Sequence, residues 1–383
     1  MTILRLFYPL ILSVLLLAAD EAQNDSNATS PNFLDKTIFS VGGRVHISTI
    51  FTSDQSSYFA GKIALDSKEK EEDIYANARE SRLWTKTRTP TEQGILRTTL
   101  EIDFLGTKDG KADKNDYYPR LRHAFVELGS FGFGQTNSTF NSVSALDTIS
   151  YPMDDTFVRQ SLLRYTYDKD MFAFDISLED PKTTLLDSSS SKIITKDDLL
   201  FDLVLRSRYY PLWGEVGIAF LSRKITHNSS IHDTKDSKYG YGINLSGRLK
   251  TFAMDDIRFN IHYGEGSGRY IAYGAFSEGV IDSDGDITLT PLYGGHLGYR
   301  HWWSPKLRST IAFSYVGADN NLDVLQTGLD KVTKESYGTQ ANLLWVPVKN
   351  LLTGLEYAWA KREVESKESG STNFLNLILR YDF

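Results

Sequence analysis

The stretch NFLNLILRYDF, residues 373–383, closes the chain and alternates between two kinds of position. One set of alternate positions is apolar to the last residue: Leu375, Leu377, Leu379, Tyr381 and Phe383. The other set is mixed and carries two charges, Arg380 and Asp382. Alternation with a period of two predicts a β-strand with one apolar face. The ends of water-soluble domains usually lie in water, so a terminal phenylalanine on this face indicates a strand that faces lipid.

The opposite end of the chain is typical of an exported protein. Residues 1–19, MTILRLFYPLILSVLLLAA, have one early basic residue and then an apolar run, and Asp20 and Glu21 follow. This layout predicts a secretory signal peptide that is cleaved after Ala19. An uncleaved anchor is the alternative, but the run is shorter than the ~20 residues of a spanning helix. Residues 20–37 are polar and predict a short periplasmic linker before a domain at 38–383.

Composition limits the function classes that remain. The chain has 383 residues, no cysteine and a formal net charge of −7. An exported chain of this length without disulfides needs another source of stability, such as a closed sheet. A negative net charge argues against nucleic-acid binding. The segments GEGSGR (264–269) and DSDGD (282–286) lack the helix of a phosphate loop and the spacing of a calcium loop. We therefore expect no cofactor and no metal.

Alternating segments recur along the whole chain after residue 37. We find sixteen of them, many about ten residues long, which is enough for a tilted strand to cross a membrane. They are 38–52, 79–88, 94–104, 119–128, 131–137, 159–167, 171–180, 199–210, 214–224, 238–250, 256–265, 291–303, 306–317, 333–346, 350–363 and 373–383.

The connections between these segments alternate between long and short. Eight are long and seven are short, as in outer-membrane barrels with long external loops and short periplasmic turns. An even number of strands lets the first and last pair antiparallel and leaves no open edge. The predicted fold is therefore all-β, a 16-stranded antiparallel transmembrane β-barrel in the outer membrane of a Gram-negative bacterium. Outer-membrane lipid and lipopolysaccharide would surround it.

The inward face of such a barrel lines a water-filled channel. Alternation places seventeen basic and nine acidic side chains on that face, Arg44 among the basic ones. Rings of arginine or lysine favour anions, so the excess of basic groups predicts anion preference. The alternative for any single arginine is that it pairs with an acid and braces the wall.

The third long connection has features of a loop that folds inward. It follows Gly132 and Gly134, which leave room beside the wall, and the loop at 138–157 is apolar for a surface segment. We expect it to narrow the channel, with its carboxylates facing the arginines: Asp147, Asp154 and Asp155. The alternative is an external loop that packs on a neighbouring subunit.

Several runs resemble the DcaP-like porins of Gram-negative outer membranes. They are RESRLWTKTRTPTEQG (79–94), RLRHAFVELGSFGFGQTNSTF (120–140), VRQSLLRYTY (158–167) and LLWVPVKNLLTGLEYAWAKRE (343–363). The resemblance implies a trimeric sixteen-stranded porin that takes up small anions, dicarboxylates included, through an arginine-rich constriction. The implied constriction residues are Arg82, Arg97, Arg120, Arg122 and Arg164. The chain departs from the family in its short linker without heptads and in the three acids of its third loop.

These observations predict a passive porin for small hydrophilic solutes, with a preference for small anions. A general porin with little charge preference and a structural or adhesive barrel are the alternatives. An enzyme is not expected, because a barrel hydrolase needs a serine or aspartate beside a histidine, and the seven histidines form no convincing pair of this kind. A gated receptor is not expected either, because it needs a larger barrel and a plug domain.

Overall fold

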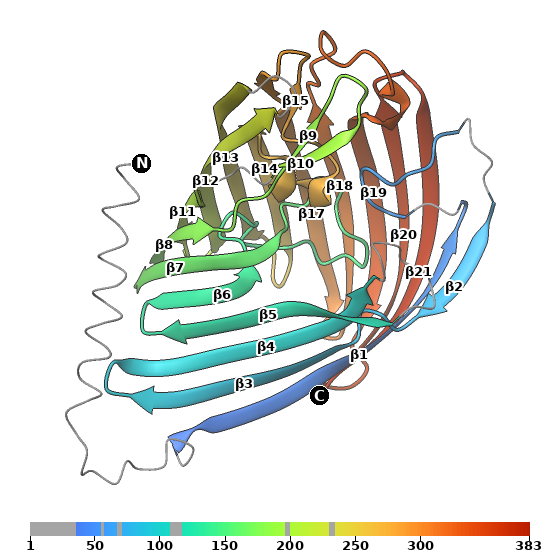
Figure 1. The fold of residues 1–383 in the computed structure, drawn as a ribbon. Coiled ribbons are helices and arrows are strands. Elements are labelled where there is room, and N and C mark those ends of the chain that lie inside the picture. The colour runs from blue at the N-terminus through green and yellow to red at the C-terminus, as the bar shows by residue number, and fades with distance from the viewer. Residues whose placement is uncertain (1–35, 55–56, 67–70, 108–116, 196–199, 230–233) are drawn as a thin grey trace. The chain divides into compact units, whose positions relative to one another are not determined.

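A computed structural model describes residues 36–54, 57–66, 71–107, 117–195, 200–229 and 234–383. The predicted signal peptide and nearly all of the predicted linker lie outside these residues. From Ile38 onward the described chain is largely β-strand (Figure 1). Within the same ranges, no helix has the length and apolar content that a membrane crossing requires.

The strands form one closed antiparallel ring. β2 and β3 both lie beside β1 and share one position, so the 17 strands of the sheet make a sixteen-stranded wall, as predicted. The ring closes between the first and last strands, with Arg44 opposite Asp382 and Thr52 opposite Phe374. The wall strands are β1 (Ile38–Thr52), β2 (Asp73–Asn77), β3 (Arg82–Thr91), β4 (Gly94–Gly106), β5 (Tyr118–Leu128), β6 (Phe131–Asn137), β7 (Arg159–Lys169), β8 (Phe172–Glu179), β11 (Asp202–Tyr209), β12 (Gly214–Ser229), β13 (Thr234–Lys250), β14 (Asp256–Glu265), β17 (Pro291–Ser304), β18 (Leu307–Ala318), β19 (Thr333–Trp345), β20 (Leu351–Val364) and β21 (Ser369–Asp382).

Alternation along each strand separates an apolar exterior from a polar interior. β8 illustrates this, because Phe174 and Ile176 are 48% and 40% exposed while Asp175 and Ser177 between them are each 1% exposed. Burying carboxylates and hydroxyls while exposing aromatic rings is favourable only if the exposed face meets lipid. Aromatic pairs sit toward the loop ends of neighbouring strands, as expected for an interfacial girdle: Tyr241–Tyr263, Tyr293–Tyr315 and Tyr337–Trp359.

The last residue completes the ring at the opposite rim. The backbone N–H of Gly43 donates to the carbonyl of Phe383, and the N–H of Phe383 donates to the carbonyl of Gly43. A Cβ on Gly43 would come within 2.3 Å of the Phe383 ring, so only glycine leaves space for it. The chain therefore ends on an aromatic residue that lies in the wall itself and stacks on Tyr381.

Two features of the connections differ from the sequence analysis. The segment 225–237 is not a long loop, because β12 and β13 continue as a paired hairpin to Ser229 and Thr234. Two long connections that were predicted as loops, one between β8 and β11 and one between β14 and β17, contribute a small second sheet. Its strands are β9 (Thr183–Leu186), β10 (Lys192–Thr195), β15 (Gly279–Ile281) and β16 (Ile287–Leu289). Leu185, Ile281 and Ile287 form its core with Ile225 of β12. Pairing between connections so far apart in sequence has no local signal.

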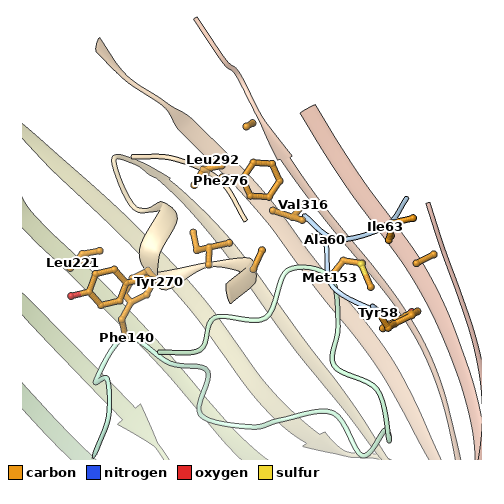
Figure 2. Close-up of a cluster of buried hydrophobic side chains, with 14 of the residues drawn as sticks. Tyr58, Ala60, Ile63, Phe140, Met153, Leu221, Tyr270, Phe276, Leu292 and Val316 are labelled. Atoms are coloured by element: carbon orange, nitrogen blue, oxygen red, sulfur yellow. The ribbon is translucent and has the colours of Figure 1, made fainter. Parts of the chain in front are cut away.

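Three connections pack inside the ring. We name them the first loop (described residues 53–54, 57–66 and 71–72), the third loop (138–157) and the sixth loop (266–290). The sixth loop contains the 3-10 turns η3 (Gly268–Tyr270) and η4 (Ala272–Gly274). A shorter turn, η5 (Leu329–Lys331), precedes β19. Side chains of the three loops join buried wall residues such as Leu221 and Val316 in one apolar core (Figure 2). The loop members of that core are Tyr58, Ala60, Ile63, Phe140, Met153, Tyr270, Ile271, Ala272 and Phe276.

Candidate functional site

The third loop crosses from β6 to the far wall and is fixed there by hydrogen bonds. The backbone N–H groups of Ile149 and Ser150 donate to the carboxylate of Glu356 on β20, each at 2.6 Å. The side-chain amide of Gln340 on β19 donates to the carbonyls of Ser150 and Tyr151 at 2.9 and 3.0 Å. Each wall partner lies on the face opposite the apolar exterior. The loop therefore lies along the inner wall (Figure 1).

The carboxylate of Asp147 holds a third attachment. It accepts hydrogen bonds from Arg308 Nε at 2.5 Å and from Arg300 Nη1 at 3.1 Å. Arg300 also donates a hydrogen bond to Asp256, the first residue of β14. Burial opposes ionisation of Asp147, but the two arginines outweigh it and hold its pKa below the usual value. Asp147 thus faces arginines, but those of β17 and β18 rather than those of β3 to β5.

The neighbouring acids Asp154 and Asp155 occupy different surroundings. Asp154 is 0% exposed and contacts His296 at 3.0 Å. The expectation that its carboxylate faces the arginines across the channel is therefore wrong, because the loop turns it into the wall. Asp155 is half-buried and accepts a hydrogen bond from the Tyr273 hydroxyl at 2.9 Å. Burial raises the pKa of Asp155 to about 6, against the opposing effects of His296 and Tyr273.

Three of the predicted arginines come together on the opposite side. Arg120 binds Asp103 through two hydrogen bonds of 3.0 and 2.6 Å. Arg122 bonds Glu101 at 2.6 Å and Asp103 at 2.9 Å. Arg82 lies 3.7 Å from Glu101. We call these five residues the arginine cluster; its side chains come from β3, β4 and β5, and three guanidinium groups share two carboxylates.

The other predicted arginines do not share the two carboxylates of this cluster. Arg44 pairs with Asp382 at 2.6 Å, beside the closing strand. Arg164 lies over the Phe125 ring at 5.2 Å, and Arg97 is exposed opposite Glu127. Among the described residues, neither Arg97 nor Arg164 forms an ion pair. They add positive charge to the wall without joining the shared carboxylates.

Sequence reasoning missed Arg159, the first residue of β7. Strict alternation from Arg164 places it on the outward face, yet its guanidinium lies 4.8 Å from the Phe157 ring and within electrostatic range of Arg120 and Arg122. A side chain at the end of a strand is not held to one face by neighbours on both sides, so alternation fails there. Among the described residues Arg159 has no carboxylate partner, and its buried Nη1 has no hydrogen-bond partner.

Aromatic side chains from all three loops gather beside Arg159. Tyr273 contacts Phe59, Tyr151 and Phe157, with ring centroids 5.1, 5.4 and 5.7 Å away. The Tyr151 hydroxyl lies within electrostatic range of Arg82 and Arg122. The loops therefore place an aromatic surface, here called the aromatic group, opposite the arginine cluster. The sequence showed the aromatic residues but not that loops so far apart bring them together.

No arrangement for metal chemistry is visible in the described part of the chain, where no three His, Asp or Glu side chains gather to hold an ion. The arrangement instead combines fixed cations, a polar wall and a loop across the interior. Such a site can bind and discriminate charged solutes by electrostatics and hydrogen bonds without forming a covalent bond.

Comparisons with known proteins place this geometry in context. A family model described as "Porin subfamily" matches residues 37–377. A search of curated proteins finds no match. The crystal structure of the outer membrane channel DcaP of Acinetobacter baumannii has a TM-score of 0.77 at 22% identity, covering 91% of this chain and 98% of that chain.

Two further solved structures share the fold at lower similarity. OmpT of Vibrio cholerae, in a trimer form, has a TM-score of 0.54 at 12% identity and covers 91% of this chain and 100% of that chain. OmpF of Salmonella typhi, in complex with daunomycin, has a TM-score of 0.53 at 13% identity and covers 92% and 99%. The resemblance to DcaP-like porins inferred from the sequence is confirmed at the level of family and fold.

Proposed function

Because this chain belongs to the porin subfamily and is an outer-membrane channel protein, we propose that it passes small hydrophilic solutes by passive diffusion and prefers small anions, dicarboxylates among them. The third loop would narrow the channel, and the arginine cluster with Arg159 would face the solute. A general porin with little charge preference is the competing function.

The charge balance beside the loop is the observation that carries this proposal. Three arginines share Glu101 and Asp103, so the arginine cluster keeps one positive charge. Arg159 adds a second, since no described carboxylate pairs with it. Charges in a water-filled pore are screened over ~8 Å at physiological salt, so the residues nearest the narrowest point decide the preference. Arginine keeps its charge across the physiological pH range.

Dicarboxylates fit this arrangement for a geometric reason. A guanidinium group can hold a carboxylate by two parallel hydrogen bonds. Arg120, with a side chain 40% exposed, is the accessible member of the arginine cluster, and Arg159 lies within electrostatic range of it. Two such groups would hold the two ends of one short dicarboxylate. A dicarboxylate has a carboxylate at each end and could contact both arginines at once, whereas a monovalent anion could contact only one of them in this way.

Reversal potentials in a salt gradient across a planar bilayer test the proposal. The wild-type channel is expected to prefer chloride over potassium, and short dicarboxylates should reduce the chloride current at lower concentration than acetate does. Replacing Arg120 and Arg122 together with serine should reduce both effects. Cation preference in the wild type, or an unchanged reversal potential in the double variant, would leave a general porin.

We also propose that the chain forms a homotrimer embedded in lipid and lipopolysaccharide. The Vibrio cholerae OmpT structure, which shares the fold, includes a trimer form. The outward face of β3 and β4 supports a protein contact, because Thr87 and Thr98 lie there and hydrogen-bond each other at 2.7 Å. By contrast, outward positions of β14 are Ile257, Phe259, Ile261 and Tyr263, as expected for lipid contact.

A further inference from the structure

The turn of the third loop around Asp154 is held by a buried group that neither the porin family match nor the arginine site explains. Asp154 contacts Asn260 and His262 from β14 and His296 from β17, and we call these four residues the latch. His296 Nδ1 lies 3.0 and 3.1 Å from the two carboxylate oxygens, and the side-chain amide of Asn260 donates at 2.8 Å. His262 Nε2 lies 3.8 Å away. All four side chains are at most 5% exposed.

The surroundings of the latch fix its parts in place. The side-chain amide of Asn244 on β13 donates a hydrogen bond to the side-chain oxygen Oδ1 of Asn260. The same oxygen accepts a hydrogen bond from the Ser142 hydroxyl at 2.6 Å. A Cβ on Gly294 would come 2.9 Å from His262 Nε2, so this glycine makes space for the ring. Beside the latch, the N–H of Met153 donates to the Ser314 hydroxyl at 2.9 Å. Asp154 is therefore the fully buried carboxylate through which this turn of the loop is attached to β14 and β17.

The imidazoles have spare bonding capacity. Among the described residues, both ring nitrogens of His262 and Nε2 of His296 have no hydrogen-bond partner. A protonated imidazole would form an ion pair with Asp154, whereas neutral rings would leave a buried carboxylate without a cation, which is unfavourable. Histidine is the side chain whose charge ordinarily changes near neutral pH. The latch thus joins a buried charge on the loop to titratable groups on the wall.

We propose that His296, assisted by His262, is a positioning residue that holds the third loop through Asp154 in a pH-dependent way. When an imidazole is protonated the turn is held against β14 and β17; when both are neutral the attachment weakens and the loop becomes more mobile. The titratable groups that face His296 are Asp154 and Asp155 of the loop and His262 of β14, with Tyr273 of the sixth loop reaching Asp155. The facing groups from β13 and β18, Asn244 and Ser314, do not titrate.

The inference rests on the proposed function only in that the third loop narrows the channel, and loop mobility can be measured without any ion current. The chain has no cysteine, so Ala145→Cys in the loop gives a unique site for a nitroxide spin label. Spectra of the full-length protein in lipid vesicles between pH 5 and pH 9 are expected to show a label that becomes more mobile as the pH rises. A label at Gln93→Cys, in the exposed turn between β3 and β4, reports the effect of pH on the label alone.

Substitutions in the latch decide the mechanism. His296→Asn keeps an N–H donor close to the Nδ1 position but cannot be protonated, so the pH dependence of the loop label should be lost. Asp154→Asn removes the buried charge and should also abolish it. His301→Asn is the matched control, because His301 pairs with Asp255 in the turn between β13 and β14. This variant should retain the wild-type profile. Heat-modifiability on gels identifies variants that fold.

Two outcomes would overturn the proposal. One is a wild-type loop label whose mobility does not change between pH 5 and pH 9. The other is a folded His296→Asn or Asp154→Asn protein that keeps the wild-type profile. A channel without anion preference but with a pH-dependent label would contradict the proposed function and leave the latch intact, so the two failures can be told apart.

Discussion

Arg159 has the guanidinium group that should matter most for charge preference. It has no carboxylate partner among the described residues and lies beside the aromatic group. A unit charge about 6 Å from a passing ion changes the ion's energy by about 0.7 kcal/mol at the dielectric constant of water, or about threefold in a population. We expect Arg159→Ser to lower the anion-to-cation permeability ratio by at least that factor.

Reversal potentials measure this change, and Arg88→Ser provides the control. Arg88 is an exposed arginine near the end of β3 that leads into the short turn to β4, so its loss should change the ratio less. Equal effects of the two substitutions would show that total lumen charge, and not the position of Arg159, sets the preference.

Asp155 should make the preference depend on pH. Its pKa is raised to about 6, chiefly by burial, so the carboxylate is charged above that pH and neutral below it. Loss of a negative charge favours anions, so the anion-to-cation ratio should be higher at pH 5 than at pH 7.5. Asp155→Asn should remove this step, measured as reversal potential against pH. A step of the same size in that variant would assign the titration to another group.

At the residue scale, the sequence predicts neighbours on adjacent wall strands better than it predicts the positions of residues in loops and at strand ends. Arg82, Arg120 and Arg122 were predicted and do meet, since they lie on adjacent strands whose register follows from the alternation. Asp154 was assigned to the channel and is buried, and Arg159 was missed. Both errors concern residues at a loop or a strand end, where neighbouring side chains in sequence do not determine direction.

Among the elements of the fold, the third loop is attached to the wall by several specific hydrogen bonds and ion pairs. Its middle part is held to the far wall by Glu356, Gln340 and the Asp147 pair with Arg308. Deleting residues 145–149 would remove Asp147 and one of the two N–H donors to Glu356. We expect a higher single-channel conductance, because less of the loop crosses the lumen, and a stronger anion preference, because Arg300 and Arg308 lose their shared carboxylate.

Planar-bilayer recordings of single channels test this expectation, with Thr339→Ala as the control. Thr339 is on β19 beside Gln340 but on the other face, so its substitution should leave conductance unchanged. Wild-type conductance in the deletion variant would place the loop outside the path of the ions.

Element positions were predictable because each wall strand carries its own alternating pattern. β1, β6 and β14 begin and end at the predicted residues, and most other wall strands differ by a few. The exceptions have no such pattern. β2 is short and set apart from β3, and the second sheet pairs β9 with β15 in parallel across a large sequence separation. Contacts between distant loops form only because the closed ring brings the loops together, so no alternating pattern within one segment of sequence predicts them.

For the whole molecule, strand number and closure followed from the alternating segments and from the succession of long and short connections. Of the interior, the sequence predicted only an inward third loop, and not that the first and sixth loops would pack with it. A ring of sixteen strands can be open or partly filled, and the sequence pattern is the same in both cases. The apolar core formed by the first, third and sixth loops with the wall shows a partly filled interior. Burial of apolar side chains stabilises the packing of these described loop residues by about 25 cal/mol per Å², even though the wall around them is polar.

The last prediction concerns the subunit contact of the proposed homotrimer. If the outward face of β3 and β4 contacts a second copy, a bulky side chain there should prevent close approach while remaining acceptable in lipid. Thr98→Trp should therefore lower the fraction of trimer that survives on unheated gels and leave the folded monomer, which still shifts in mobility on heating. Ala341→Trp is the matched control, because Ala341 is outward on β19 between Thr339 and Leu343. Loss of trimer in the control alone would move the subunit contact to the β19 side, and loss in neither variant would remove the threonine face from the interface.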